Sequence, residues 1–260
     1  MSTVLASSPR RYRFLPIALV GGLAAALSAC ALEADEWVSG IPWPEVKVVD
    51  AGPVGGPPSD AVVLFDGKSM SQWDGGEKWP VKDGVAISAG GDIRSKRAFG
   101  DCQLHVEWAS PAKVEGSGQG RGNSGVYMMG AYEVQILDSY NNSTYVDGQC
   151  AAIYKQRPPL VNVCRKPGEW QAYDIIFEAP RFDGAGKLLR PAFVTVLQNG
   201  VLVQNHFQLP GATFWDQPPT YSAHPAKLPL LLQHHGNPVR FRNLWIRELP
   251  PADAPPPEKK

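Results

Sequence analysis

The chain has little of what marks several common protein classes. It contains only four cysteines in 260 residues, and its 25 acidic and 25 basic side chains cancel. The few cysteines do not occur with other ligand residues at the short spacings typical of zinc sites, which argues against such a site. The balanced charge gives no indication that nucleic acid or an acidic polymer is a partner. Beyond the N-terminal segment no amphipathic helical run exceeds about two turns, so a helical domain is not indicated either.

Long apolar runs are also scarce. The longest covers residues 14–29, follows Arg10, Arg11 and Arg13, and ends in small residues. It is shorter than the ~20 residues that a membrane-spanning helix needs, and its flanks are those of a signal peptide. Because Leu27-Ser-Ala-Cys30 resembles a bacterial lipobox, we expect a lipoprotein signal over residues 1–30, lipidated at Cys30. An ordinary cleaved signal peptide with an incidental cysteine is the alternative. Either way we expect export, with the lipid anchor placing the protein in the periplasm, at the outer membrane or at the cell surface.

Proline and glycine divide the rest of the chain. Residues 31–60 include Ala51-Gly-Pro-Val-Gly-Gly-Pro-Pro58, and residues 250–260 include Pro255-Pro-Pro257. Such segments cannot form a helix or a central strand. We therefore expect a tether over 31–60, a folded domain over 61–249 and a disordered tail over 250–260.

Within the domain, short apolar or alternating runs are separated by turn residues. Leu104, Val106 and Trp108 alternate with polar residues and should share one face of a strand. Gly130-Ala131 and Gln198-Asn-Gly200 have the composition of hairpin turns. Many short strands at this spacing predict an all-β fold, namely an antiparallel two-sheet jelly-roll sandwich. The expected strands cover residues 61–65, 85–87, 103–108, 125–129, 132–137, 173–177, 193–197, 201–203, 228–233 and 239–247.

Three cysteines remain in the mature domain. In an oxidising compartment Cys150 and Cys164 are expected to form a disulfide across a proline-containing loop. Closing a loop of about 15 residues contributes roughly 3 kcal/mol in the chain-entropy model. Cys102 is then left as a small buried apolar residue.

The segment Tyr132-Glu-Val-Gln-Ile-Leu-Asp138 carries the strongest functional signal. On a strand Glu133 and Gln135 share one face, while Val134 and Ile136 point to the core. Asp138 joins the polar face only if the strand is bulged or ends near Leu137. Carboxylates and an amide on one sheet face suit acid/base chemistry on sugars. The alternative is a half-buried strand whose polar face meets water.

Several short segments recur in a fixed order from about residue 62 to 249. They are Leu64-Phe-Asp-Gly-Lys68 with Trp73, Gly122-Asn-Ser-Gly-Val-Tyr127, Tyr132–Asp138, Ala152-Ile-Tyr154, Pro167-Gly-Glu-Trp170, Leu232-Gln-His-His-Gly236 and Val239-Arg-Phe-Arg-Asn243. Together and in this order they resemble the 3-keto-disaccharide hydrolase domain family, long a domain of unknown function. The resemblance implies a concanavalin A-like jelly roll in which a concave sheet binds carbohydrate.

The resemblance implies cleavage of 3-keto-glycosides, in which the ketone acidifies the C2 proton. A base removes that proton, the enolate expels the glycosidic oxygen from C1, and water then adds. Glu133 or His235 is the candidate base; His235 is chosen over His234 because it fits the family's Gln-x-His-Gly pattern. Asp138 either orients a group or caps a turn, and Glu133 could instead form a salt bridge with Arg121. Predicted substrate-binding residues are Arg121, Asn123, Tyr127, Gln135, Gln233 and Trp215.

Two other functions stay open. A similar Glu-x-Asp-x-x-Glu strand occurs in retaining β-glucanases, but here Gln135 replaces the middle carboxylate and Asp138 the last. The second alternative is a lectin-like module that binds a glycan without turnover. The sequence requires no cofactor, although Glu133, Asp138 and His235 are ligand types that could hold a divalent cation. The expected partners are a small oxidised saccharide, the membrane through the lipid anchor alone, no nucleic acid, and an upstream sugar 3-dehydrogenase.

Overall fold

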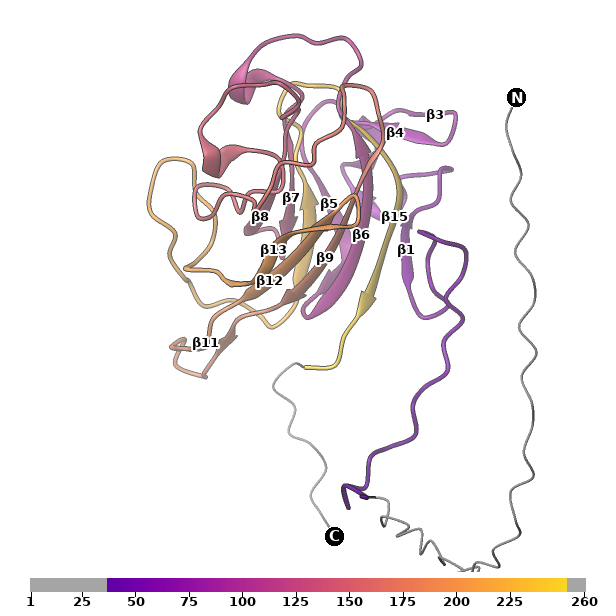
Figure 1. Cartoon of the computed structure of the whole chain (residues 1–260), viewed down its shortest axis with the longest axis vertical. Helices are drawn as coiled ribbons and strands as arrows, with labels where there is room; N and C mark the ends of the chain where they lie inside the picture. Colours follow the sequence, from indigo (N-terminus) through magenta and orange to yellow (C-terminus); the bar gives the residue numbers. More distant parts are fainter. Residues whose placement is uncertain (1–36, 252–260) are drawn as a thin grey trace, which may run out of the picture. The chain divides into compact units, whose positions relative to one another are not determined.

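The computed structural model describes residues 37–251, and residues 43–251 lie within one compact unit. Its strands form two large antiparallel sheets and one small one (Figure 1). This confirms the predicted all-β sandwich. The predicted signal peptide, the lipidation site Cys30 and most of the C-terminal tail lie outside the described residues. Within the described part of the chain, no helix is both long and apolar enough to span a bilayer.

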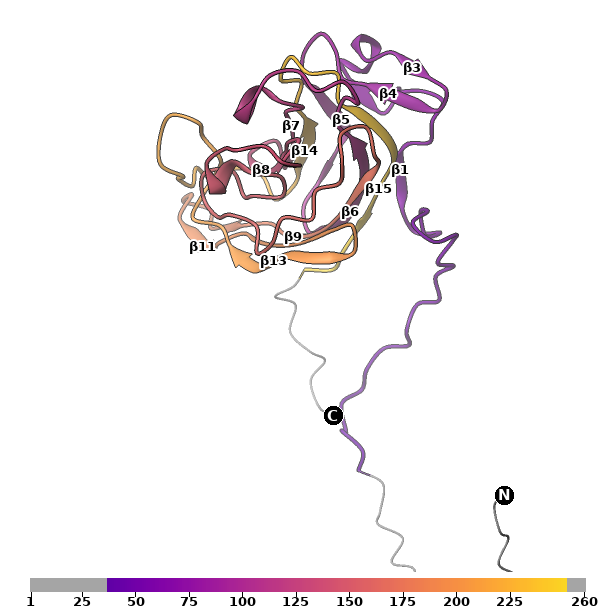
Figure 2. The same ribbon diagram turned by 45° about the horizontal axis from the view of Figure 1, so that its top comes forward.

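The larger sheet has eight strands in the order β13-β12-β9-β6-β15-β4-β3, and β1 also pairs with β15. In the rotated view of Figure 2, β6, β9 and β15 again lie next to one another. The strand bounds are β1 Val62–Phe65, β3 Val81–Lys82, β4 Val85–Ile87, β6 Cys102–Ala109, β9 Gln171–Glu178, β12 Phe193–Gln198, β13 Val201–Gln208 and β15 Arg240–Glu248.

The second large sheet has five strands in the order β2-β5-β14-β7-β8. A separate two-stranded hairpin and three short 3-10 helices complete the described elements. The five strands are β2 Trp73–Asp74, β5 Ile93–Phe99, β7 Ser124–Met128, β8 Tyr132–Ile136 and β14 Leu228–Leu232; the hairpin is β10 Arg181–Phe182 with β11 Leu188–Arg190; the helices are η1 Gly76–Lys78, η2 Gly118–Gly120 and η3 Val146–Gly148.

The core lies where alternating apolar side chains of the two sheets meet. Leu104, Val106 and Trp108 of β6 are each at most 1% exposed, as the alternation predicts. From β8, Val134 and Ile136 enter the same core cluster. Because side chains alternate across a strand, burying these residues turns Glu133 and Gln135 to the opposite face of the five-stranded sheet. The core thus determines which side of the sheet carries polar groups.

Two turns account for hairpins that the sequence predicts. Asn199 and Gly200 both have positive φ, 53° and 80°, and connect Gln198 to Val201. A two-residue loop of this kind matches strand twist, which explains the Asn-Gly pair. Between β7 and β8 the loop includes Met129 at φ 54° and Gly130 at φ 67°. This hairpin places Tyr127 directly beside Glu133.

The last part of the predicted tether is held against the larger sheet. The carbonyl oxygen of Gly55 accepts hydrogen bonds from Asn243 Nδ2 at 2.7 Å and Trp245 Nε1 at 3.2 Å. Asp60 accepts two hydrogen bonds from the guanidinium of Arg247, at 3.1 and 2.9 Å. Residues 55–60 therefore contribute to the folded unit although they contain no strand.

Candidate active site

A cavity of about 240 Å³ opens on the face of the five-stranded sheet that is turned away from the core. Its floor comes from three adjacent strands or strand ends. Tyr127 of β7 lies opposite Glu133 of β8, and Gly125 lies opposite Gln135. Gln233, just past β14, donates its backbone N–H to Gly125 O at 3.0 Å. The cavity is lined by Asn123, Tyr127, Glu133, Gln135, Tyr154, Thr213, Phe214, Trp215, Gln233 and His235.

Gly125 makes room for the acidic group. A Cβ atom at this position would stand 2.5 Å from Glu133 Oε1 and 2.9 Å from Tyr127 Cε2. Both contacts are shorter than side chains tolerate, so any larger residue would displace the carboxyl group or the ring. Glycine is needed here for close approach of side chains, since no positive φ is recorded at this position.

Glu133 is a buried acid without a cationic partner. Its side chain is 3% exposed, and no ion pair to it occurs among the described residues. Its pKa is raised to about 8: burial is the main cause, a hydrogen bond donated by the Tyr127 hydroxyl partly offsets it, and the charge of Asp92 adds to it. The predicted alternative of a Glu133–Arg121 salt bridge is therefore wrong. A carboxyl group with a pKa near neutrality can both accept and release a proton.

Tyr127 connects Glu133 to its neighbours. Burial, and then the charge of Glu133, raise the pKa of this phenol, so it keeps its proton at neutral pH. Its oxygen accepts a hydrogen bond from Gln233 Nε2 at 3.3 Å. The result is a directed row in which Gln233 donates to Tyr127 and Tyr127 donates to Glu133. The hydroxyl has a single proton, so it can donate to a ligand oxygen only in place of Glu133.

A network of side-chain amides lies beside Glu133 and includes two residues that line the cavity, Asn123 and Gln135. Gln135 Nε2 donates to Gln119 Oε1 at 2.9 Å and to Gly148 O at 3.3 Å. Asn123 Nδ2 donates to Gln119 O at 2.7 Å. These bonds fix the Gln135 amide so that its Oε1 is buried with no protein partner. An unpaired buried acceptor is costly, and a ligand hydroxyl would satisfy it.

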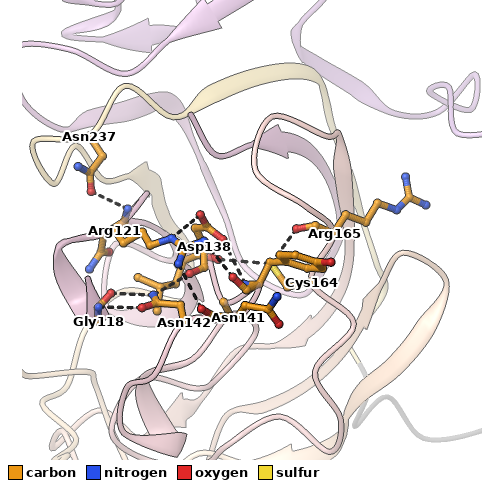
Figure 3. A network of polar contacts seen from close by, with 12 residues as sticks. Gly118, Arg121, Asp138, Asn141, Asn142, Cys164, Arg165 and Asn237 are labelled. Atoms are coloured by element: carbon orange, nitrogen blue, oxygen red, sulfur yellow. Dashed lines mark hydrogen bonds and ion pairs between the residues drawn. The ribbon is translucent and has the colours of Figure 1, made fainter. Parts of the chain in front are cut away.

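Arg121 and Asp138 lie in a different cluster, shown in Figure 3. Strand β8 ends at Ile136, and Arg121 Nε donates to Asp138 Oδ2 at 2.8 Å. The remaining guanidinium donors reach the carbonyl oxygens of Tyr140 and Asn141. Asp138 Oδ1 also accepts the backbone N–H of Tyr140 at 3.2 Å, which is the turn-capping role considered for it. The structure does not bring either residue into the cavity with Glu133.

The two adjacent histidines have different surroundings. His235 is exposed and lines the cavity. His234 is half-buried, its Nδ1 lies 2.7 Å from Ser88 Oγ, and its backbone N–H donates to Asp92 at 2.8 Å. Both lie beyond the end of β14 at Leu232, in a segment without regular structure, so strand alternation does not separate them.

Sequence reasoning missed Tyr154, Thr213 and Phe214 of the cavity wall. They reach it because segment 151–154 pairs with the free edge of β8, where Gln135 N–H donates to Ala152 O at 2.9 Å. Thr213 N–H donates to Ala131 O at 2.8 Å, and Thr213 Oγ1 accepts the N–H of Glu133 at 3.1 Å. Both segments are loops, whose pairing depends on tertiary contacts. The only available signal was Ala152-Ile-Tyr154 in the family resemblance.

Of the three cysteines of the domain, Cys102 and Cys150 are buried and Cys164 is half-buried. Cys150 and Cys164 are free thiols in the structure rather than a disulfide. Their sulfurs are nevertheless hydrogen-bond neighbours: burial and then Cys164 raise the pKa of Cys150, whereas Cys150 lowers the pKa of Cys164. The bond itself stays a prediction. Cys102 is fully buried, as predicted, and no three His, Cys, Asp or Glu side chains in the described ranges cluster to hold a metal ion.

Comparison with known proteins identifies the family. A protein from Parabacteroides distasonis ATCC 8503, described as a "putative glycosyl hydrolase", is 47% identical, with a TM-score of 0.75 over 83% of this chain and 95% of its own. Two others of that organism and description share only the fold. One is 21% identical, with a TM-score of 0.54 over 76% of this chain and 96% of its own. The other is 22% identical, with a TM-score of 0.53 over 73% of this chain and 99% of its own. No curated protein matches the chain. Residues 60–247 match the model of the 3-keto-alpha-glucoside-1,2-lyase-like domain, and the chain therefore belongs to that family.

Proposed function

We propose that this protein cleaves 3-keto-glycosides by removing the C2 proton and eliminating the group at C1. The observation that carries the proposal is Glu133, a buried carboxyl group with no ion pair among the described residues and a pKa raised to about 8. The ionised form of an acid with this pKa is a stronger base than an ordinary carboxylate. The family to which the chain belongs supplies the substrate class.

The reaction balances without an oxidant. Glu133 takes the C2 proton, and the C2–H electron pair forms an enolate whose negative charge rests on the C3 oxygen. As the C3 carbonyl re-forms, a C1–C2 double bond forms and the C1–O bond breaks. The leaving oxygen takes a proton and departs as an alcohol; addition of water to the unsaturated ketone then gives net hydrolysis. No covalent glycosyl-enzyme is required.

The other cavity residues have matching roles in the proposal. The hydroxyl of Tyr127 retains its proton and donates a hydrogen bond where charge develops on the C3 oxygen. Gln135 Oε1 accepts a sugar hydroxyl, and Asn123 and Gln233 help to position the ring. His235, the exposed titratable group of the cavity, delivers the proton to the leaving oxygen. Arg121 and Asp138 do not contact the substrate; their ion pair and hydrogen bonds stabilise the loops within residues 118–142.

A glucanase-type mechanism has less support from the site. A retaining glycosidase needs two carboxyl groups about 5–5.5 Å apart across the bond, and an inverting one needs them about 6.5–9.5 Å apart. Of the described residues that line the cavity, Glu133 is the only carboxylic acid. The nearest sequence candidate, Asp138, is committed to Arg121.

The direct test compares matched substrates. The purified protein is incubated with a 3-keto-disaccharide and with the same disaccharide unoxidised, and products are followed by NMR. We expect cleavage of the oxidised sugar alone, with an unsaturated ketone or its hydrate as product. Cleavage of only the unoxidised sugar would indicate a conventional glycosidase. Binding of either sugar without turnover would indicate a lectin-like module.

A further inference from the structure

A group of three aromatic rings, two of them exposed, borders the cavity. We call Tyr145, Tyr154 and Trp215 the aromatic rim. Trp215 is 74% exposed and Tyr145 is 42% exposed, although both are large and partly apolar. Tyr154 and Trp215 also line the cavity, so the rim continues directly from the site of Glu133. Exposed aromatic surface beside a polar pocket is typical of a binding surface.

The rim is held in place by Lys155. Its ammonium group donates a hydrogen bond to Trp215 O at 2.8 Å and lies 5.7 Å from the Tyr145 ring and 5.9 Å from the Tyr154 ring. The two tyrosine hydroxyls are 2.7 Å apart. Lys155 has a positive φ of 57°, an unusual backbone conformation for this residue. One side chain thus fixes two loops, so their rings need little ordering when a ligand binds.

Neighbouring glycine and threonine residues also support the rim. A Cβ atom at Gly148 would stand 2.1 Å from Tyr145 Cε2, so the ring packs directly on the glycine backbone. The loop that carries Trp215 is tied to β8 through Thr213, as described above, and Gln156 Nε2 donates to Gly211 O at 3.2 Å. The backbone of the rim is therefore fixed while the Trp215 ring stays accessible.

The size of the cavity limits what it can enclose. Its volume of about 240 Å³ lies below the range of roughly 300–1,000 Å³ found for pockets that bury drug-sized ligands. One sugar ring is an appropriate occupant, whereas a disaccharide would extend beyond the opening. The ring that carries the ketone must occupy the cavity because Glu133 is there. The second ring then lies outside, where the aromatic rim borders the opening.

We propose that the aromatic rim binds the leaving-group ring of the substrate by stacking, with Trp215 as its main contact. This inference rests on the proposed function and names its substrate class: glycosides whose leaving group is itself a ring, above all disaccharides. Stacking against the apolar face of a pyranose makes no demand on individual hydroxyl groups. The rim should therefore accept different leaving sugars but discriminate against small alkyl groups.

The experiment measures kcat/KM of the wild type and of Trp215→Ala with two substrates, a 3-keto-disaccharide and methyl 3-keto-glucoside. We expect the loss with the disaccharide to exceed the loss with the methyl glycoside by about tenfold, equivalent to about 1.4 kcal/mol. Trp215→Phe should recover most of the difference because it retains an aromatic face. Trp43→Ala is the matched control, since Trp43 is 59% exposed but does not line the cavity.

Equal losses with both substrates, or no loss with the disaccharide, would overturn the proposal. If the wild type cleaves neither substrate, the proposed function fails and not the rim. In that case calorimetry of the 3-keto-disaccharide with the wild type and Trp215→Ala decides: weaker binding to the variant supports the rim, and unchanged binding overturns it.

Discussion

Glu133 and Asp138 are two acids on one seven-residue segment, and the fold gives them opposite surroundings. Both are almost fully buried, at 3% and 1% exposure. Asp138 faces the guanidinium of Arg121 at 2.8 Å and accepts a backbone N–H. Glu133 faces a phenol and the open cavity, and burial raises its pKa to about 8. Equal burial therefore accompanies a structural ion pair in one case and an unpaired carboxyl group with a raised pKa in the other; what differs is the partner.

The largest expected effect is on activity, which should depend on Glu133 far more than on Asp138. Glu133→Gln keeps the shape of the side chain and can still accept the Tyr127 hydrogen bond, but it cannot take a proton. We expect kcat on a 3-keto-disaccharide to fall about 10²- to 10⁴-fold, the usual contribution of a general base. Substrate binding, measured by calorimetry, should change little. Full activity of this variant would remove Glu133 from the mechanism.

The second prediction concerns the free energy of unfolding, which should depend on the ion pair of Asp138. Asp138→Asn leaves Arg121, 13% exposed, without its ion-pair partner, and should lower the free energy of unfolding by about 3 kcal/mol. Urea denaturation followed by tryptophan fluorescence measures it. Replacing both partners, Arg121→Met with Asp138→Leu, should recover part of the loss. If Asp138→Asn is stable but inactive, Asp138 belongs to the catalytic machinery after all.

The third prediction perturbs the reactive acid without changing it. In Gly125→Ala the added methyl group would lie 2.5 Å from Glu133 Oε1. Because misplacement of about 1 Å can cost 10²-fold in rate, we expect kcat/KM to fall about 10- to 100-fold. A Cβ at Gly184 would meet nothing within 4 Å, so Gly184→Ala is the control. Wild-type kinetics in Gly125→Ala would show that the close contact does not matter.

The last prediction concerns the pH dependence of stability. The pKa of Glu133 in the folded protein, about 8, exceeds its ordinary value of 4.5. The folded state thus holds the proton more tightly, so ionisation of Glu133 reduces stability progressively between about pH 4.5 and 8. Relative to the wild type, Glu133→Gln should gain stability progressively across this window and keep the gain above pH 8. Urea titrations at pH 4.5 and 8.5 measure the difference; a constant difference would contradict the raised pKa.

Much of the fold follows from local sequence. Alternation identified β6 and β8, and Asn199-Gly200 specified a hairpin because those residues tolerate positive φ. Strand β5 was missed because its sequence, Ile93-Arg-Ser-Lys-Arg-Ala-Phe99, buries Ser95 between two inward apolar ends. The Ser95 hydroxyl donates to Arg97 O and accepts the N–H of Leu230, so only the neighbouring strand makes it an interior residue.

The sequence by itself determined that Glu133 and Gln135 share a face, because the period of a strand is fixed by backbone geometry. It also determined that Gly125 and Tyr127 precede them on a neighbouring hairpin strand. Only the tertiary structure decided that Arg121 pairs with Asp138 and leaves Glu133 unpaired, because charges are matched across loops that are distant in sequence. The same holds for the pKa of Glu133, which depends on how completely segments 151–154 and 213–215 exclude water from its carboxyl group.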